Sequence, residues 1–206
     1  WRQMDIHVAP TKANLIRAKN LLEFSEKGFE LLDKKRNVLI REMMSLMDKA
    51  KEVQDKIEVV FEEAYHAFRV ASVSMGLNEL KEIGLSIPVE ENYEILFKSV
   101  MGVEIPTVKY DKKDLTAHYG FYRTNSAIDI AVKKFREVKY LIYDLAEIEN
   151  SVYKLAMEIK KTQKRANALE KIQIPKYTEQ VKIMQEVLEE KEREDFFRLK
   201  RVKQRK

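Results

Sequence analysis

The sequence contains no cysteine and little glycine or proline, with only 5 glycines and 4 prolines in 206 residues. Without cysteine there can be no disulfide, no thiolate metal ligand and no cysteine nucleophile. Because glycine and proline usually mark the turns and loops between helices and strands, their scarcity indicates a few long secondary-structure elements. These absences exclude disulfide-rich and cysteine-dependent proteins and favour a predominantly helical chain.

Long hydrophobic runs are missing as well. No stretch of about 18 consecutive apolar residues occurs, and the first ten residues hold no apolar core of the kind found in secretory signals. We therefore expect a chain that neither spans nor enters a membrane by itself.

Motifs for nucleotide binding, metal binding or catalysis are also absent. The sequence has neither a phosphate-binding Gly-x-x-x-x-Gly-Lys-Ser/Thr loop nor a Gly-x-Gly-x-x-Gly turn. Its three histidines, His7, His66 and His118, are far apart and have no metal-ligand spacing. Neighbouring acids such as Glu62–Glu63 and Glu90–Glu91 fit solvated helix faces better than a buried acid–base pair. We expect no catalytic residue, cofactor site or metal site, and so no enzyme activity in this chain.

What the sequence does contain is charge, since 35% of its residues are Asp, Glu, Lys or Arg, beside 45% hydrophobic residues. The net charge is +5, and much of the excess lies near the end of the chain, at Arg198, Lys200, Arg201, Lys203, Arg205 and Lys206. This basic end has two readings. It is either a solvated terminus or a surface for nucleic acid or an acidic protein.

The apolar residues of the first third recur every seven positions. One series consists of Leu15, Leu22, Phe29, Arg36, Met43, Ala50, Ile57, Ala64 and Ala71, and the other of Ala18, Ser25, Leu32, Leu39, Leu46, Val53, Val60, Ala67 and Ser74. Fifteen of these eighteen positions are apolar. A heptad seam held for so long predicts a left-handed coiled coil, with Thr11 as the N-cap of its first helix.

The second half repeats the pattern. Its two series are Ala131, Val138, Leu145, Val152, Ile159 and Ala166, and Lys134, Leu141, Ile148, Leu155, Thr162 and Leu169. An antiparallel pairing of the two halves would place Met75 beside about Thr124 and Leu15 beside about Met184. The polar seam residues Ser25, Arg36, Ser74, Lys134 and Thr162 either fix the register of the pair or mark places where the helices diverge.

A short β-hairpin is predicted between the two helices. Residues 93–100 and 103–110 are rich in Val, Ile, Phe and Tyr and flank Met101-Gly102, which suits a two-residue turn, and Pro106 suits an edge strand. The predicted fold is all-α: a long antiparallel left-handed coiled coil of N- and C-terminal helices with this hairpin in the connection. We expect one structural unit with the first helix at 11–77, the connection at 78–115 and the second helix at 116–206.

The last part of the second helix differs from the rest. Pro175 predicts a kink or a short break near Ile174, because its ring clashes with the preceding turn. About twenty C-terminal residues would extend past the first helix. Within them Phe196, Phe197 and Leu199 form an apolar stripe that predicts contact with a partner.

Several local stretches together resemble the D subunit of the V-type and archaeal A-type rotary ATPases, over nearly the whole chain. They are Ala9-Pro10-Thr11-Lys12, where Lys12 replaces the usual arginine, Val100 to Pro106, Tyr119-Gly120-Phe121-Tyr122 with Asn125 to Asp129, and Thr162 to Glu170 followed by Ile174-Pro175. The run Arg165-Ala166-Asn167-Ala168-Leu169-Glu170 is the most specific of them.

This resemblance implies a central stalk, or rotor shaft, that couples ATP hydrolysis or synthesis in a catalytic ring to rotation of a membrane ion-translocating ring. It implies as partners the catalytic A and non-catalytic B subunits, the F subunit and a socket subunit (C or d), with no nucleotide bound by this chain. It further implies a cytoplasmic protein peripheral to the membrane, with neither nucleic-acid binding nor membrane insertion. The expected partner contacts are Pro10, Thr11, Lys12, Met101, Gly102, Val103, Arg165, Asn167, Phe196, Phe197 and Leu199.

A second hypothesis remains from composition alone. A static coiled-coil adaptor, or a basic rod that binds nucleic acid, would have the same heptads and the same basic end. Its partners would distinguish it from a rotor shaft.

Overall fold

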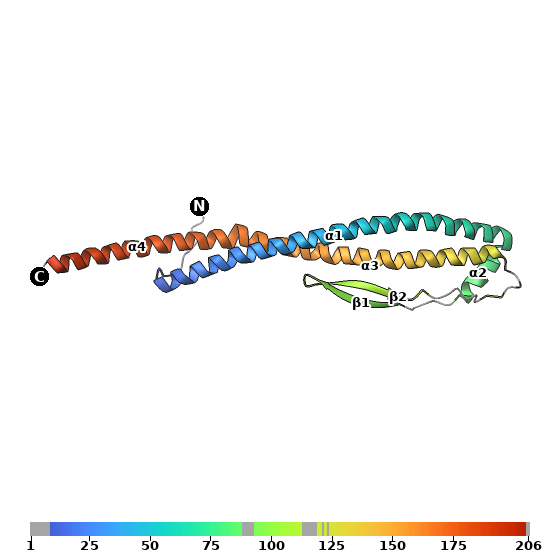
Figure 1. Ribbon diagram of the computed structural model, residues 1–206, viewed down its shortest axis with the longest axis horizontal. Coiled ribbons are helices and arrows are strands. Elements are labelled where there is room, and N and C mark those ends of the chain that lie inside the picture. Colours follow the sequence, from blue (N-terminus) through green and yellow to red (C-terminus); the bar gives the residue numbers. More distant parts are fainter. Residues whose placement is uncertain (1–8, 88–92, 113–118, 121, 123, 205–206) are drawn as a thin grey trace. The chain divides into compact units, whose positions relative to one another are not determined.

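The computed structural model describes residues 9–87, 93–112, 119–120, 122 and 124–204. His7, Glu90–Glu91, His118, Phe121, Arg205 and Lys206, all named above, lie outside this part of the chain. The elements in order are α1 (Lys12–Met75), α2 (Leu77–Ser86), β1 (Tyr93–Val100), β2 (Val103–Tyr110), α3 (Ser126–Ala168), the π-helical turn η2 (Leu169–Gln173) and α4 (Ile174–Gln204) (Figure 1).

The contacts divide the chain into two compact units. The first contains residues 1–38 and 159–206, and the second contains residues 39–158. In each unit a segment of α1 packs antiparallel against the returning half of the chain. The structure thus confirms an all-α coiled coil with a β-hairpin in the central segment. No helix in the described ranges is both long enough and apolar enough to cross a membrane.

In the first unit, the core lies between the start of α1 and the middle of α4. Ala18, Val181 and Met184 are buried and are joined by the half-buried Leu15 and Leu22. Leu15 therefore lies in the same cluster as Met184, which confirms the predicted register at this end. Further along, a Cβ added to Gly28 would lie 3.5 Å from Leu169 Cδ1, an ordinary packing distance between the two helices.

In the second unit, the core between α1 and α3 combines small and large side chains. Leu39 and Leu155 have no exposed surface, and Ala64, Ala71 and Ala131 are buried to almost the same extent. Alanine at the seam allows two helix backbones to approach closely. At the end of α1, the Asn125 amide donates to Ser74 Oγ at 2.7 Å, which confirms the register predicted around Met75 and Thr124.

The predicted seam of α1 is the face that the structure buries. All eighteen heptad positions from Leu15 to Ser74 are buried or half-buried except Ser74, which is exposed. Two polar seam residues reach the opposite helix, because Arg36 contacts Gln163 in the first unit and Lys134 contacts Glu63 in the second. Ser25 and Thr162 are only 5% and 2% exposed. The helices therefore do not diverge at these positions.

Helix termini follow local capping rules. Thr11 Oγ1 accepts the N–H of Asn14 at 3.2 Å, as the predicted N-cap of α1 should. Asn125 caps α3 in the same way, since its Oδ1 accepts the N–H of Ala127 at 3.1 Å. α1 ends at Met75, and Gly76, whose φ of 88° favours glycine, separates α1 from α2.

Helix α2 was not predicted, because nearly all of it lies in the segment 78–115 that was expected to connect the two long helices. The structure buries Leu80 of α2 in a cluster with Ala71 and Ile128. This packing against α1 and α3 compensates for the low helix propensity of Gly84, which lies inside α2.

The chain remains helical through Pro175, with a widened turn directly before it. In η2 the N–H of Ile174 donates to the carbonyl of Leu169, five residues earlier, instead of the usual four. Pro175 has no N–H to donate, and its ring would crowd the carbonyl four residues earlier in a regular helix. The chain is therefore not broken at Pro175, because α3, η2 and α4 follow one another without interruption from Ser126 to Gln204.

The same turn also corrects the phase of the buried seam. Up to the first residue of η2 the seam contains Ala166 and Leu169, and after η2 it contains Ile174, Tyr177, Val181 and Met184. The steps from Ala166 to Ile174 and from Leu169 to Tyr177 are eight residues instead of seven. One extra residue would rotate the seam by about 100° in a regular helix. A π turn takes up that residue, so α4 still presents its apolar face to α1.

Strands β1 and β2 form a two-stranded antiparallel hairpin that lies alongside α3 in the second unit (Figure 1). Tyr93 pairs with Tyr110 and Val100 with Val103, so the predicted bounds of 93–110 are confirmed. Met101 has φ 51° and Gly102 has φ 79°, the two positive angles of a type I′ turn.

Candidate partner-binding surfaces

The last part of α4 forms a fully exposed helical end. Every described residue from Glu189 to Gln204 is exposed. Phe196, Phe197 and Leu199 are 67%, 63% and 69% exposed. Val202, at 64% exposed, extends this stripe and was missed, although its spacing of three residues from Leu199 could have revealed it. The four apolar residues lie among basic ones, which gives this end both a hydrophobic and an electrostatic means of contacting a partner.

The start of α1 makes contacts within its own unit. Lys12 Nζ lies 2.7 Å from Glu192 Oε1 on α4. The hydrogen bond with Glu192 raises the pKa of Lys12, and the same bond lowers the pKa of Glu192. Both side chains are largely exposed, so the pair is accessible to a partner and contributes little to folding. Pro10 is half-buried, and Thr11 is exposed and used as a cap.

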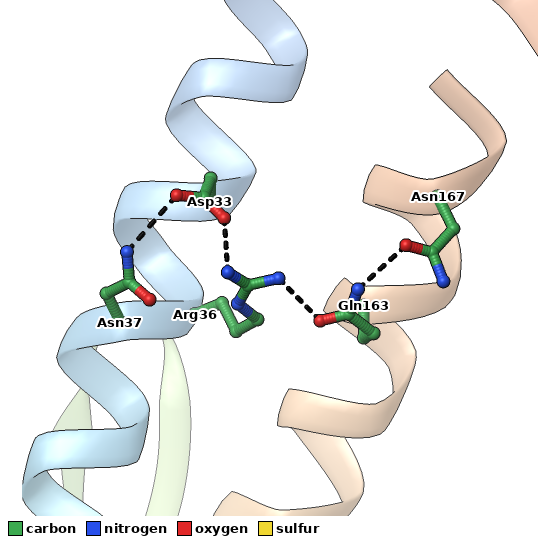
Figure 2. A network of polar contacts seen from close by, with 5 residues as sticks. All are labelled: Asp33, Arg36, Asn37, Gln163 and Asn167. Carbon is green, nitrogen blue, oxygen red and sulfur yellow. Dashed lines mark hydrogen bonds and ion pairs between the residues drawn. The ribbon is translucent and has the colours of Figure 1, made fainter. Parts of the chain in front are cut away.

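A network of polar side chains connects α1 with α3 in the first unit (Figure 2). Arg36 Nη1 donates to Gln163 Oε1 at 2.6 Å, and its Nη2 pairs with Asp33 Oδ1 at 2.5 Å. Gln163 Nε2 then donates to Asn167 Oδ1 at 2.7 Å, while Asn37 donates to the other oxygen of Asp33 at 3.1 Å. Arg36 thereby satisfies a carboxylate on its own helix and an amide on the other.

Two of the expected contact residues belong to this region and differ in exposure. Asn167 is half-buried and directs its amide oxygen to Gln163, so its polar group serves the helix pair. Arg165 is exposed on the outside of α3. The structure therefore leaves Arg165 on the surface and places Asn167 in the network.

The tip of the hairpin combines exposed and buried positions. Met101 is 50% exposed, whereas Val103 is 8% exposed and packs inward, as does Ile105. Gly102 lies with Met101 in the exposed turn. Met101 and Gly102 are thus accessible to a partner, while the side chain of Val103 holds the hairpin in place.

The hairpin is fastened to α3 by main-chain contacts that the sequence did not indicate. Glu147 Oε2 accepts the N–H of Val108 at 2.6 Å, and Ser151 Oγ donates to the carbonyl of Pro106 at 3.4 Å. A hydroxyl–carboxylate bond adds to them, since Tyr110 donates to Asp144 Oδ1 at 2.9 Å. Burial, and then this bond, raise the pKa of Tyr110 to about 12.

Aromatic rings reinforce the same contact. Tyr110 stacks on Tyr140 with centroids 5.1 Å apart, and Tyr93 and Tyr143 are 5.6 Å apart. Lys154 Nζ lies 4.9 Å from the centroid of the Phe97 ring. Isolated two-stranded hairpins are marginal in water, and these contacts supply the support that this one needs.

A second surface that sequence reasoning missed lies on α1 and α3 of the second unit. A groove there is lined by residues that include Phe61, Tyr65, His66 and Ile130. Tyr65 and Ile130 are 49% and 54% exposed, and Phe135 packs edge-on against both Phe61 and Tyr65. Phe61, Tyr65 and Phe68 follow a spacing of four and three residues beside the heptad seam, a signal that could have revealed this second apolar stripe.

Comparison with known proteins agrees with this architecture. The family model for the D subunit of ATP synthase matches residues 14–204. The D subunit of the V-type ATP synthase of Thermotoga neapolitana is 43% identical over 198 residues, which cover 96% of this chain and 98% of that protein. The D subunit of the A-type ATP synthase of Pyrococcus abyssi is 38% identical over 201 residues, covering 96% and 94%. The chain therefore belongs to the family of ATP synthase D subunits.

Proposed function

We propose that this chain is the central stalk of a V/A-type rotary ATPase, the shaft that couples ATP hydrolysis or synthesis in a catalytic ring to rotation of a membrane ion-translocating ring. The observation that carries the proposal is the family match, which runs through both units from residue 14 to residue 204. It includes the helix pair as well as the exposed end of α4.

The helix pair suits the transmission of torque. Twisting two helices past each other would shear the packed seam, whose residues Leu39 and Leu155 have no exposed surface. Arg36 and Lys134 add polar contacts between the helices that a slipped register would lose. Two segments joined in this way respond to torque at one end by turning together.

The outer surfaces suit changing contacts. A rotor has to pass successive ring interfaces without binding one pose tightly, so charged and polar outer faces are favoured over large apolar anchors. Apolar side chains are nevertheless exposed at the end of α4 and beside the groove of the second unit. We assign the end of α4 to a collar of the A and B subunits. The F subunit and the socket subunit (C or d) would take the surfaces of the second unit.

In this role the chain is not catalytic. ATP would be bound and hydrolysed by the ring, and this chain would bind no nucleotide. It would act at the membrane surface as a peripheral part of the complex, held there by its partner subunits.

The test is affinity purification of the tagged full chain from native lysate under low-salt and high-salt conditions. We expect the catalytic and non-catalytic ring subunits and the F subunit to be recovered together. Recovery of nucleic acid in a salt-sensitive manner, with no ATPase subunit, would support the static or nucleic-acid-binding alternative and contradict the proposal.

A further inference from the structure

The outer edge of β1 is the most open strand edge in the described chain. A two-residue turn makes Val100 and Val103 a hydrogen-bonded pair, and such pairs alternate along an antiparallel ladder. The backbone groups of Ile95 and Phe97 must then point away from β2. By the same alternation, the backbone groups of Pro106 and Val108 on β2 point away from β1. Ser151 contacts the Pro106 carbonyl there, and Glu147 contacts the Val108 N–H.

The two outer edges of the hairpin therefore differ in whether their backbone groups have hydrogen-bond partners. α3 covers the outer edge of β2, and Pro106 lies there at a position that costs no ladder bond. The outer edge of β1 has no proline, and within the described residues no hydrogen bond to its outward backbone groups is found. Ile95, Leu96 and Phe97 are 55%, 49% and 63% exposed. A strand of eight residues whose outer edge no described residue covers, and whose centre is apolar, is a template for strand pairing.

The sequence of this edge is complementary to itself. The run is Glu94-Ile95-Leu96-Phe97-Lys98, with opposite charges at equal distances from Leu96. Antiparallel pairing of two copies about Leu96 would place Glu94 of each copy opposite Lys98 of the other. It would also place Ile95 opposite Phe97, an aliphatic–aromatic pair that stabilises sheets.

The hydrogen-bonding pattern selects the same register. In a pairing centred on Leu96, Ile95 faces Phe97 and Tyr93 faces Ser99, and all four have outward backbone groups. A shift by one residue would set outward groups against inward ones. A shift by two residues would keep the hydrogen bonds but place a charged residue, either Lys98 or Glu94, opposite Leu96.

From this geometry we propose that the free chain pairs with a second copy of itself through the outer edges of their β1 strands, forming a four-stranded antiparallel sheet. The pairing satisfies the open edge and shields its apolar residues before the chain joins other proteins. It does not depend on the proposed shaft function. The edge is short, so we expect a weak, concentration-dependent dimer with a Kd of about 1–100 μM.

The test is sedimentation equilibrium of the purified full chain over a concentration range that spans this Kd. Lys98→Glu sets like charges opposite each other twice and should weaken the dimer about tenfold. Glu94→Lys combined with Lys109→Glu should weaken it similarly, while keeping the opposite charges of the Glu94–Lys109 pair inside each hairpin. The triple variant with all three changes should restore the dimer.

A backbone variant tests the edge directly. Ile95→Pro removes one outward N–H without removing a bond to β2, so it should abolish the dimer and leave the helical circular dichroism unchanged. Ile95→Thr retains the N–H and should still dimerise. The proposal is overturned by a monomer at every concentration, by a dimer insensitive to Lys98→Glu, or by failure of the triple variant to recover. The affinity purification tests only the shaft function. Its outcome, whether or not ATPase subunits are recovered, does not change what the sedimentation experiment says about dimerisation.

Discussion

The guanidinium of Arg36 on α1 donates to the amide oxygen of Gln163 on α3 at 2.6 Å, from a heptad position that an apolar residue would usually occupy. The same guanidinium pairs with Asp33. Removing it would leave two half-buried acceptors without their cationic partner, a larger loss than one exposed ion pair would cause.

Arg36→Ala should accordingly lower the free energy of unfolding by about 2 kcal/mol. Urea denaturation followed by circular dichroism measures this change. Arg17→Ala, on the exposed face of the same helix, is the matched control and should change stability by less than about 0.5 kcal/mol. Equal effects of the two substitutions would show that the network contributes no stability of its own.

The wide turn η2 predicts a difference between two single-residue deletions. Deleting the exposed Lys171 removes the extra residue of η2 and restores a seven-residue seam spacing. Combined with Pro175→Ala, which removes the ring that would clash in a regular helix, this deletion should leave the melting temperature nearly unchanged. Deleting the exposed Lys160, in the regular part of α3, puts the seam out of phase and should cost more than about 2 kcal/mol. Thermal denaturation of both variants measures this. Similar losses in both would refute the phase-correcting role of η2.

The tyrosines that hydrogen-bond to carboxylates predict a loss of stability in alkali. Burial, followed by the bonds to Asp144 and Asp129, raises the pKa values of Tyr110 and Tyr119 to about 12, above the usual value of 10. Between pH 10 and 12 the folded chain then holds more protons than the unfolded chain, so stability must fall with rising pH across this window.

Melting temperatures measured across that window check this dependence. The Tyr110→Phe and Tyr119→Phe variants should each show a shallower decline than the parent chain. Tyr122 is 96% exposed, so Tyr122→Phe should leave the slope unchanged. If neither Tyr110→Phe nor Tyr119→Phe changed the decline of melting temperature with pH, groups other than these two tyrosines would cause that decline.

Truncation after Leu188 separates folding from function. The described residues removed, Glu189 to Gln204, are all exposed, whereas the core residues Val181 and Met184 remain. We expect the melting temperature to stay close to that of the full chain. In the assembled complex, the ratio of ions pumped to ATP hydrolysed should fall. Unchanged coupling would contradict the assignment of this end to a collar of the ring.

A milder variant tests the apolar residues alone. Phe196→Ser combined with Phe197→Ser keeps the length and charge of α4 and should reproduce part of the coupling loss. Lys200→Gln, on the same exposed end, is the control and should retain coupling. If the lysine variant alone lost coupling, charge rather than apolar contact would be responsible.

Periodicity predicted most of this fold, because heptads and turns are local signals. The seam from Leu15 to Ala71, the N-cap at Thr11 and the Met101-Gly102 turn all follow from spacing and residue type. Helix α2 was not predicted because the packing of Leu80 against α1 and α3, which outweighs the low helix propensity of Gly84, is not visible in the local sequence. The turn η2 was not predicted because Pro175 signals only a disturbance of the helix, and the seam on both sides shows how the disturbance is resolved.

The contacts of the hairpin were beyond sequence reasoning for a different physical reason. Glu147 and Ser151 bind main-chain atoms of Val108 and Pro106, and main-chain partners leave no signature in residue type. Aromatic pairs such as Tyr110 with Tyr140 join positions far apart in the sequence, which periodicity within one element cannot connect.

The main-chain bonds between α3 and β2 affect which substitutions in the hairpin can be tolerated. Because α3 holds β2 at a main-chain N–H and a main-chain carbonyl, Val108 can be replaced by any residue other than proline without removing the groups that make these two bonds. The side chains that make these two bonds belong to α3, at Glu147 and Ser151. A relative with a different hairpin sequence and the same two α3 residues could keep both main-chain bonds, whereas the contacts that Tyr93 and Tyr110 make with α3 depend on the hairpin side chains themselves.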